Sequence, residues 1–144
     1  MTIKEYPQNW RDLQIKVGEI LEQSGFKVEI EKNLNGARIE VEIDVYATEC
    51  IDNRNYKIIC ECKHWNSNIP QNVVHSLHTV ASDLGINKAY LITTSEFQSG
   101  ALNSTKNTLI ELLTWESFQE TFFKSWYLNF FSYKLSNIIK NNYN

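Results

Sequence analysis

Regular alternation over residues 37–48 constrains the fold of this chain more than any other feature of the sequence. The segment reads ARIEVEIDVYAT, and the apolar residues at every second position are Ile39, Val41, Ile43 and Val45. A period of two residues is that of a β-strand with one buried face. A second apolar segment, YKIICECKHW over residues 56–65, follows after the polar, turn-like stretch ECIDNRN. Because this link is short, we expect the two strands to pair antiparallel.

The rest of the chain adds helices and strands in an order typical of an α/β fold. Residues 8–24 carry apolar side chains at helical spacing, and Gly25 ends that pattern. Pro70 stands where the first residue of a second helix would lie. The other predicted elements are a strand over 26–33, a turn over 33–36, a helix over 70–84, a strand over 88–95, a short helix over 100–107 and a strand over 108–114. Two strands separated by a helix favour a parallel crossover, so the sequence predicts a mixed sheet flanked by helices in the order αβββαβαβ.

Length, charge and hydropathy limit the class of protein. The chain has 144 residues, enough for one compact domain, and a net charge of −3. This charge argues against a protein that holds nucleic acid by positive charge alone, although bound metal ions can supply positive charge locally. No apolar run reaches the length of a membrane span, and the first ten residues lack the apolar core of a signal peptide. We therefore expect a cytoplasmic protein without a membrane partner.

The cysteines support the same compartment. Cys50, Cys60 and Cys62 are odd in number and show no disulfide framework, which indicates a reducing environment. A zinc site at Cys60, Cys62 and His64 is disfavoured because no second pair of ligands follows. The favoured interpretation is that the cysteines pack as small apolar residues.

The segment IICECKHW places an acid and a base on one face of a strand. Glu61 and Lys63 are two residues apart and project together, while Cys60 and Cys62 project to the opposite face. Asp44 lies on the preceding strand, and antiparallel pairing can bring it beside Glu61. Two carboxylates and an ammonium in one small volume suit Mg²⁺-dependent phosphodiester hydrolysis. The alternative is a weak, solvated Glu–Lys pair. An isolated Glu-x-Lys pattern favours this alternative, but the position of the pattern at the end of an apolar strand argues against it.

These segments resemble a known family. EIDVYA followed by IICECKHW is similar to the signature of the PD-(D/E)XK nucleases, and INKAYLITTSEFQSGAL with NTLIELLTWESF resembles the Mrr-like restriction-endonuclease branch. The resemblance covers residues 12–118. It implies a restriction-endonuclease-like fold, a mixed β-sheet flanked by helices, and a Mg²⁺-dependent endonuclease that hydrolyses DNA phosphodiester bonds, with Mn²⁺ as a substitute. A role in restriction or antiviral defence is a further implication of the resemblance.

The resemblance also assigns roles to individual residues. Asp44 and Glu61 would be metal ligands, the backbone carbonyl of Cys62 an additional ligand, and Lys63 the catalytic lysine. Asp44, Glu61 and Lys63 are thus the expected catalytic set. Mrr-like proteins often carry Gln at the position of Glu61, whereas Glu is the form common across the wider superfamily.

One departure from the family concerns the first helix, on which many relatives carry a glutamate that helps organise the metal. Counted back from Gly25, the matching residue is Gln14, which borders the apolar stripe of Trp10 and Val17 and faces inward, whereas Glu19 points away. Because Gln brings no negative charge, we expect weaker metal binding or one ion rather than two.

Nearby polar residues have less specific interpretations. Gln71 opens the second helix and could touch the site, although a plain polar residue at a helix start is favoured. His75 and His78 are expected on a solvated helix face. Glu42 is a candidate to lie behind the metal ligands, and Glu40 is expected in solvent.

Aromatic residues concentrate after the expected core. Residues 115–133 hold half of the aromatic side chains of the chain and predict a helix with a wide apolar surface. We divide the chain into a nuclease core over residues 1–118 and a helical extension over 119–144. The extension either packs on the core or forms an interface with a second copy or a partner protein.

Two rival functions use the same fold. One is a catalytically weak or inactive module that serves as an interaction or DNA-binding subunit, which Gln14 and the negative net charge favour mildly and the intact catalytic set disfavours. The other is a structure-specific junction nuclease, which would need a basic surface that the sequence does not show.

Overall fold

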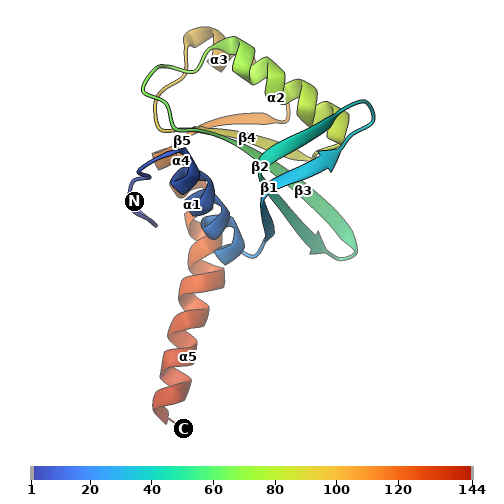
Figure 1. Cartoon of the computed structure of the whole chain (residues 1–144). Helices are drawn as coiled ribbons and strands as arrows, with labels where there is room; N and C mark the ends of the chain where they lie inside the picture. Colours follow the sequence, from blue (N-terminus) through green and yellow to red (C-terminus); the bar gives the residue numbers. More distant parts are fainter. Residues whose placement is uncertain (1, 144) are drawn as a thin grey trace.

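Five strands form one mixed sheet with helices on both faces, the architecture that the sequence predicts (Figure 1). The computed structural model describes residues 2–143. The elements are α1 Trp10–Gln23, β1 Lys27–Asn35, β2 Glu40–Ile51, β3 Arg54–Lys63, α2 Gln71–Leu84, β4 Lys88–Thr93, α3 Ser99–Asn103, β5 Ile110–Thr114, α4 Trp115–Trp126, the π-helical turn η1 Tyr127–Phe131 and α5 Ser132–Tyr143. The strands lie side by side in chain order. β1, β2 and β3 pair antiparallel, and β3, β4 and β5 pair parallel through the crossover helices.

Each face of the sheet has its own apolar core. α1 and α4 cover one face, and α2 and α3 cover the other (Figure 1). Buried residues on the α1 side include Leu13, Ile20, Ala47, Ile58 and Phe118. Those on the α2 side include Ile59, Leu77, Leu91, Ala101 and Ile110. Each buried Leu, Ile or Phe side chain contributes about 1.5–3 kcal/mol, so the central strands are held firmly between two helical layers.

The helix boundaries follow local capping chemistry. The Asn9 side chain accepts a hydrogen bond from the backbone N–H of Asp12 and begins α1. Gly25, with φ of 108°, takes the left-handed backbone that follows the helix. Pro70 is the cap of α2 rather than its first helical residue, so that expectation is wrong by one position. Gly85, with φ of 66°, ends α2 in the left-handed conformation.

The hairpin between β2 and β3 is tighter than the sequence analysis expected. Its loop is only Asp52 and Asn53, which both have left-handed φ values of 51° and 64°. Two such residues form the turn whose twist matches that of the flanking strands. The polar segment 49–55 is therefore mostly strand, and the prediction of a loop over its whole length is wrong.

The alternation predicted for β2 changes face within the strand. Val45 belongs to the core on the α1 side, but Ile43 belongs to the core on the α2 side, and Val41 packs against that second core. Ile39 precedes β2 and is exposed. The prediction that these four residues share one face is therefore wrong. Their alternation is real, but it is interrupted between Ile43 and Val45.

β1 changes face at the same level of the sheet. Val28 packs against the α1-side core and Leu34 against the α2-side core, although the two positions have the same parity. In β2 the change falls at Asp44, whose neighbours on either side enter different cores. In the hairpin formed by β1 and β2, the half that contains the connecting turn therefore packs with α2, and the opposite half packs with α1.

The aromatic C-terminal segment is helical throughout and leaves the domain part-way along. Trp115, Phe118 and Phe122 are buried against α1 and the sheet. The Trp126 indole N–H donates to the Gln23 side chain over 2.8 Å. In η1, the Asn129 side chain donates to the Gln23 carbonyl over 2.9 Å. Beyond η1, α5 projects away from the sheet (Figure 1). Among residues 2–143, no helix combines the length and the apolar character that a membrane span requires.

Candidate active site

The site lies where β2 and β3 part. Their antiparallel pairing runs as far as Val45 and Cys60 and then stops, because β2 continues beside β1 while β3 continues beside β4. Asp44 and Glu61 would be the next directly opposed pair. Instead of a backbone partner, the N–H of Cys62 finds the Asp44 carboxylate, which accepts its hydrogen bond over 2.8 Å. Because the strands part here, the Asp44 side chain reaches β3, and its hydrogen bond with Cys62 holds it there.

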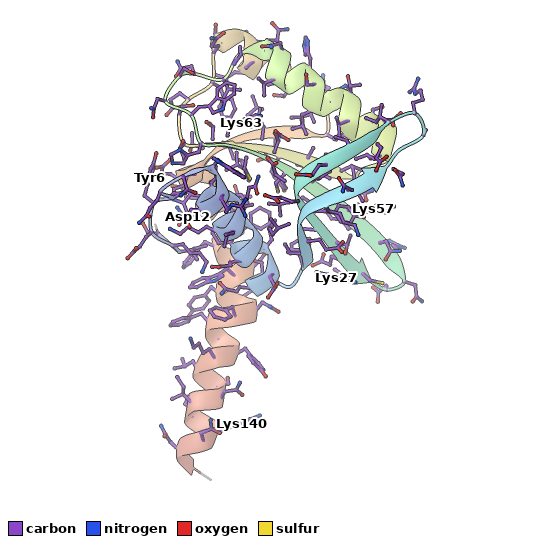
Figure 2. All side chains as sticks on the ribbon, viewed as in Figure 1. Tyr6, Asp12, Lys27, Lys57, Lys63 and Lys140 are labelled. Carbon is purple, nitrogen blue, oxygen red and sulfur yellow. The ribbon has the colours of Figure 1, made fainter. Side chains whose placement is uncertain are left out.

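The structure brings the predicted catalytic set together. Lys63 Nζ lies 2.9 Å from Glu61 Oε1, and both side chains are about a quarter exposed. Lys63 Nζ also lies 5.5 Å from the centre of a Trp65 ring. Figure 2 shows Lys63 on the sheet between the α2 layer and the N-terminal end of α1, with Lys57 towards the other end of β3. The ammonium is thus restrained on the same strand face as Glu61, as the spacing of two predicts.

An open cavity of about 410 Å³ collects these groups. We call it the acidic cavity, and its polar lining residues include Gln14, Glu31, Glu42, Asp44, Glu61 and Lys63. Trp10 and Trp65 form part of its wall. Trp10 is half exposed there, so the prediction that it lies in the buried stripe of α1 is wrong.

The electrostatics of the cavity favour a cation. Burial and the nearby charge of Glu61 raise the pKa of Asp44 to about 6, although the N–H of Cys62 works in the opposite direction. Both causes penalise the ionised carboxylate, and a divalent cation between Asp44 and Glu61 would remove the repulsion.

Gln14 adds a buried oxygen atom to the lining of the same cavity. Its side chain lines the acidic cavity and is only 5% exposed, yet its Oε1 atom has no hydrogen-bond partner. A buried carbonyl without a partner is costly, and an oxygen of this kind suits Mg²⁺. Its inward orientation agrees with the sequence prediction, as does the exposure of Glu19.

The donor set fits a hydrated magnesium ion. Among residues 2–143, no group of three or more His, Cys, Asp or Glu side chains is arranged to hold a metal. Mg²⁺ characteristically takes one or two carboxylates and keeps several water molecules. Asp44, Glu61, Cys62 and Gln14 all line the acidic cavity, so oxygen atoms of these residues could hold such an ion.

The cysteine thiols are unsuited to metal binding. Cys60 and Cys62 are buried in the α1-side core, and burial raises the pKa of both thiols well above its usual range. Neutral thiols are poor ligands. Cys50 is exposed on the outer part of the sheet, so the prediction that all three cysteines pack in the core fails for this one.

The other candidates lie outside the acidic cavity. Gln71 contacts the His75 ring over 3.2 Å and lies beside Gly100. His75, His78 and Glu40 are exposed, as expected. Glu31 lines the cavity but was absent from the sequence-based set, because nothing in an alternating strand marks one glutamate as different from its neighbours.

A carboxylate placed on α1 should strengthen metal binding but lower the stability of the metal-free protein. In Gln14→Glu, an added negative charge in the cavity would repel Asp44 and Glu61, so we expect the free energy of unfolding in EDTA to fall by about 1–2 kcal/mol. With Mg²⁺ the same charge should tighten binding roughly tenfold. Thermal unfolding with and without Mg²⁺ measures both effects.

Ile15→Glu is the matched control for this variant. It adds the same charge to the exposed face of α1, so its stability should not respond to Mg²⁺ beyond the wild-type response. An equal response of the two variants would show that the charge at position 14 does not reach the metal.

Comparison with known proteins supports the fold and gives the family. The family model Mrr_cat, described as a restriction endonuclease, matches residues 7–122. No curated protein matches the chain.

Three solved structures share the architecture. A protein of unknown function, AF1548, is 22% identical with a TM-score of 0.62, over 75% of this chain and 59% of that one. Can2 from Sulfobacillus thermosulfidooxidans, solved with cyclic tetra-adenylate, is 18% identical with a TM-score of 0.64, over 82% of this chain and 36% of that one. VC1899 from Vibrio cholerae is 14% identical with a TM-score of 0.61, over 83% of this chain and 33% of that one. This chain thus spans less than two thirds of each, and at these identities the likeness concerns the fold.

The family match spans most of the chain and includes α1, the parting strands and the acidic cavity. The mixed sheet with flanking helices is the restriction-endonuclease-like fold that the resemblance implied. The chain belongs to the restriction endonuclease family that the Mrr_cat model describes.

Proposed function

We propose that this protein is a Mg²⁺-dependent endonuclease that hydrolyses phosphodiester bonds of DNA in defence against foreign DNA. The observation that carries the proposal is the convergence of Asp44, Glu61 and Lys63 on one cavity at the parting of β2 and β3. Membership of a restriction endonuclease family supports the same reaction. We place its action in the cytoplasm.

Each residue of the proposed catalytic set has a distinct task. Asp44, Glu61, the Cys62 carbonyl and Gln14 would hold the ion, which would polarise a phosphate oxygen when bound. Lys63 would orient the attacking water or stabilise the negative charge that develops on the phosphoryl group. Its ion pair with Glu61 keeps the ammonium beside the proposed metal ligand before the substrate arrives.

The test is cleavage of plasmid DNA by the purified protein with Mg²⁺, Mn²⁺ or EDTA. Metal-dependent nicking or linearisation supports the proposal, and a parallel reaction with RNA separates the two substrates. A folded protein that binds metal and DNA but cuts neither substrate would instead support the non-catalytic module.

We also propose that the helical extension associates with a second copy of this chain. Phe131, Leu135 and Ile138 are exposed and follow one another at spacings of four and three residues, which places them on one side of the helix. A matching apolar stripe is available on an identical helix. In this division, residues 1–118 are the nuclease core and 119–144 the extension, whose terminal residue, like residue 1, lies outside the described residues.

Leu135→Glu should therefore separate the copies. A carboxylate in the apolar stripe should raise the dimer dissociation constant at least about tenfold, or roughly 1.4 kcal/mol. Ser136→Glu adds the same charge beside the stripe and should leave the dimer unchanged. Light scattering over a micromolar concentration series measures the mass, and a monomeric wild-type protein at tens of micromolar would refute self-association.

A further inference from the structure

Glu31 interrupts the pairing of β1 with β2 directly opposite Asp44. The register pairs Ile30 with Val45 and Lys32 with Ile43, but the intervening pair is not formed. Glu31 has φ of 53°, a left-handed value that is unfavourable for a residue with a Cβ atom. The side chains of β1 and β2 change face at this same level of the sheet. Glu31 therefore lies at the break in the alternation, directly beside the proposed metal ligand Asp44.

The side chain of Glu31 lines the acidic cavity together with Asp44 and Glu61. No salt bridge involving Glu31 is formed among the described residues. Glu29, two positions earlier, is instead paired with Lys32 over 3.3 Å and does not line the cavity. Glu31 is thus the residue of β1 whose carboxylate borders the site.

The charge balance of the acidic cavity is negative. Four glutamate and aspartate side chains line it, and the one lysine or arginine among its described lining residues is Lys63, already paired with Glu61. Gln14 lines the same cavity and is more than nine-tenths buried, and its Oε1 atom has no hydrogen-bond partner. This oxygen independently indicates a cation that oxygen atoms can coordinate. A hydrated divalent cation satisfies both requirements.

We propose that Glu31 binds the metal ion through one of its water molecules and supplies a third negative charge to the site. The proposal rests on the metal dependence proposed above. Among residues 2–143 no three of these carboxylates form a ligand cluster, so the contact proposed for Glu31 is a hydrogen bond to a metal-bound water molecule and not a direct bond to the ion. A carboxylate on β1 then replaces, from the other side of the cavity, the charge that Gln14 does not bring from α1.

Substitution by aspartate and asparagine separates the charge from the backbone. Both residues tolerate the left-handed conformation and differ only in charge. Glu31→Asp should retain Mn²⁺ affinity within about threefold of wild type, whereas Glu31→Asn should bind Mn²⁺ roughly tenfold more weakly, as is typical when a group hydrogen-bonded behind the ligands is lost. Glu29→Gln, the control on the same strand, should bind as wild type does.

The measurement is the electron paramagnetic resonance signal of free Mn²⁺ in a titration without DNA, with circular dichroism to confirm the fold. Equal Mn²⁺ affinity of Glu31→Asn and Glu31→Asp, alongside normal binding by the wild type, would overturn the role of Glu31 and leave the metal site standing. Failure of the wild-type protein to bind Mn²⁺ would overturn both this inference and the proposed metal dependence.

Discussion

Replacement of Lys63 by alanine will abolish DNA cleavage while leaving the fold and metal binding intact. The ammonium lies 2.9 Å from Glu61 in a residue that lines the acidic cavity. Loss of a group that moves a proton or stabilises developing charge typically costs about 10²–10⁴-fold in rate. Glu61 remains available to the metal in this variant, so Mn²⁺ affinity should not fall.

Lys57→Ala is the control for this substitution. Lys57 lies on the same strand but is exposed and outside the cavity (Figure 2). Single-turnover cleavage of a labelled duplex, together with Mn²⁺ titration, gives the two readouts. Wild-type cleavage by Lys63→Ala would remove Lys63 from the catalytic set and direct attention to other groups at the cavity.

Asp44→Asn will remove cleavage and metal binding together. The asparagine can still accept the hydrogen bond from the Cys62 N–H, so the shape of the site is preserved. The charge between the strands is lost, and we expect cleavage to fall by at least about 10³-fold. Glu40→Gln, an exposed neighbour on β2, is the control and should cut at the wild-type rate.

The same variant should be more stable than wild type when metal is absent. Because the pKa of Asp44 is raised to about 6 in the folded protein from an ordinary value of 3.8, the folded state holds a proton that the unfolded state has released between these values. Raising the pH from about 4 to 7 should therefore destabilise the wild type by roughly 1–2 kcal/mol, allowing for solvent around the partly exposed carboxyl.

Urea unfolding in EDTA at several pH values tests this. Asp44→Asn should lack this component of the pH dependence, and Mg²⁺ at pH 7 should return the lost stability to the wild type alone. Parallel curves for both proteins across this pH range would show that Asp44 ionises freely in the folded state.

Much of this architecture could be predicted because the local patterns are unambiguous. The existence of strand β2, the spacing of Glu61 and Lys63 and the glycine after α2 each agree with the structure. The convergence of Asp44 with Glu61 was predicted because antiparallel strands joined by a short link have few possible registers. Its physical basis, the parting of β2 and β3, depends on which neighbour each strand prefers, and no local pattern encodes that choice.

The change of face at Glu31 and Asp44 could not be predicted for a related reason. Hydrophobic periodicity shows that every second residue is buried, but not which of two cores receives it. Both faces of this sheet are covered, so Ile43 and Val45 read alike in the sequence although they contact different helices. The sequence did not predict Glu31 as a site residue because nothing in it indicates the left-handed backbone conformation of Glu31.

That change of face makes the position of Asp44 depend on two layers at once. The turn that connects β1 to β2 is bound to α2, where the Asp83 carboxylate accepts hydrogen bonds from the backbone N–H groups of Arg38 and Ile39. The base of the hairpin is fastened to α1 through Val28 and Val45. The position of Asp44 therefore depends on contacts with both helical layers, including those that Asp83 makes with Arg38 and Ile39 far from the cavity.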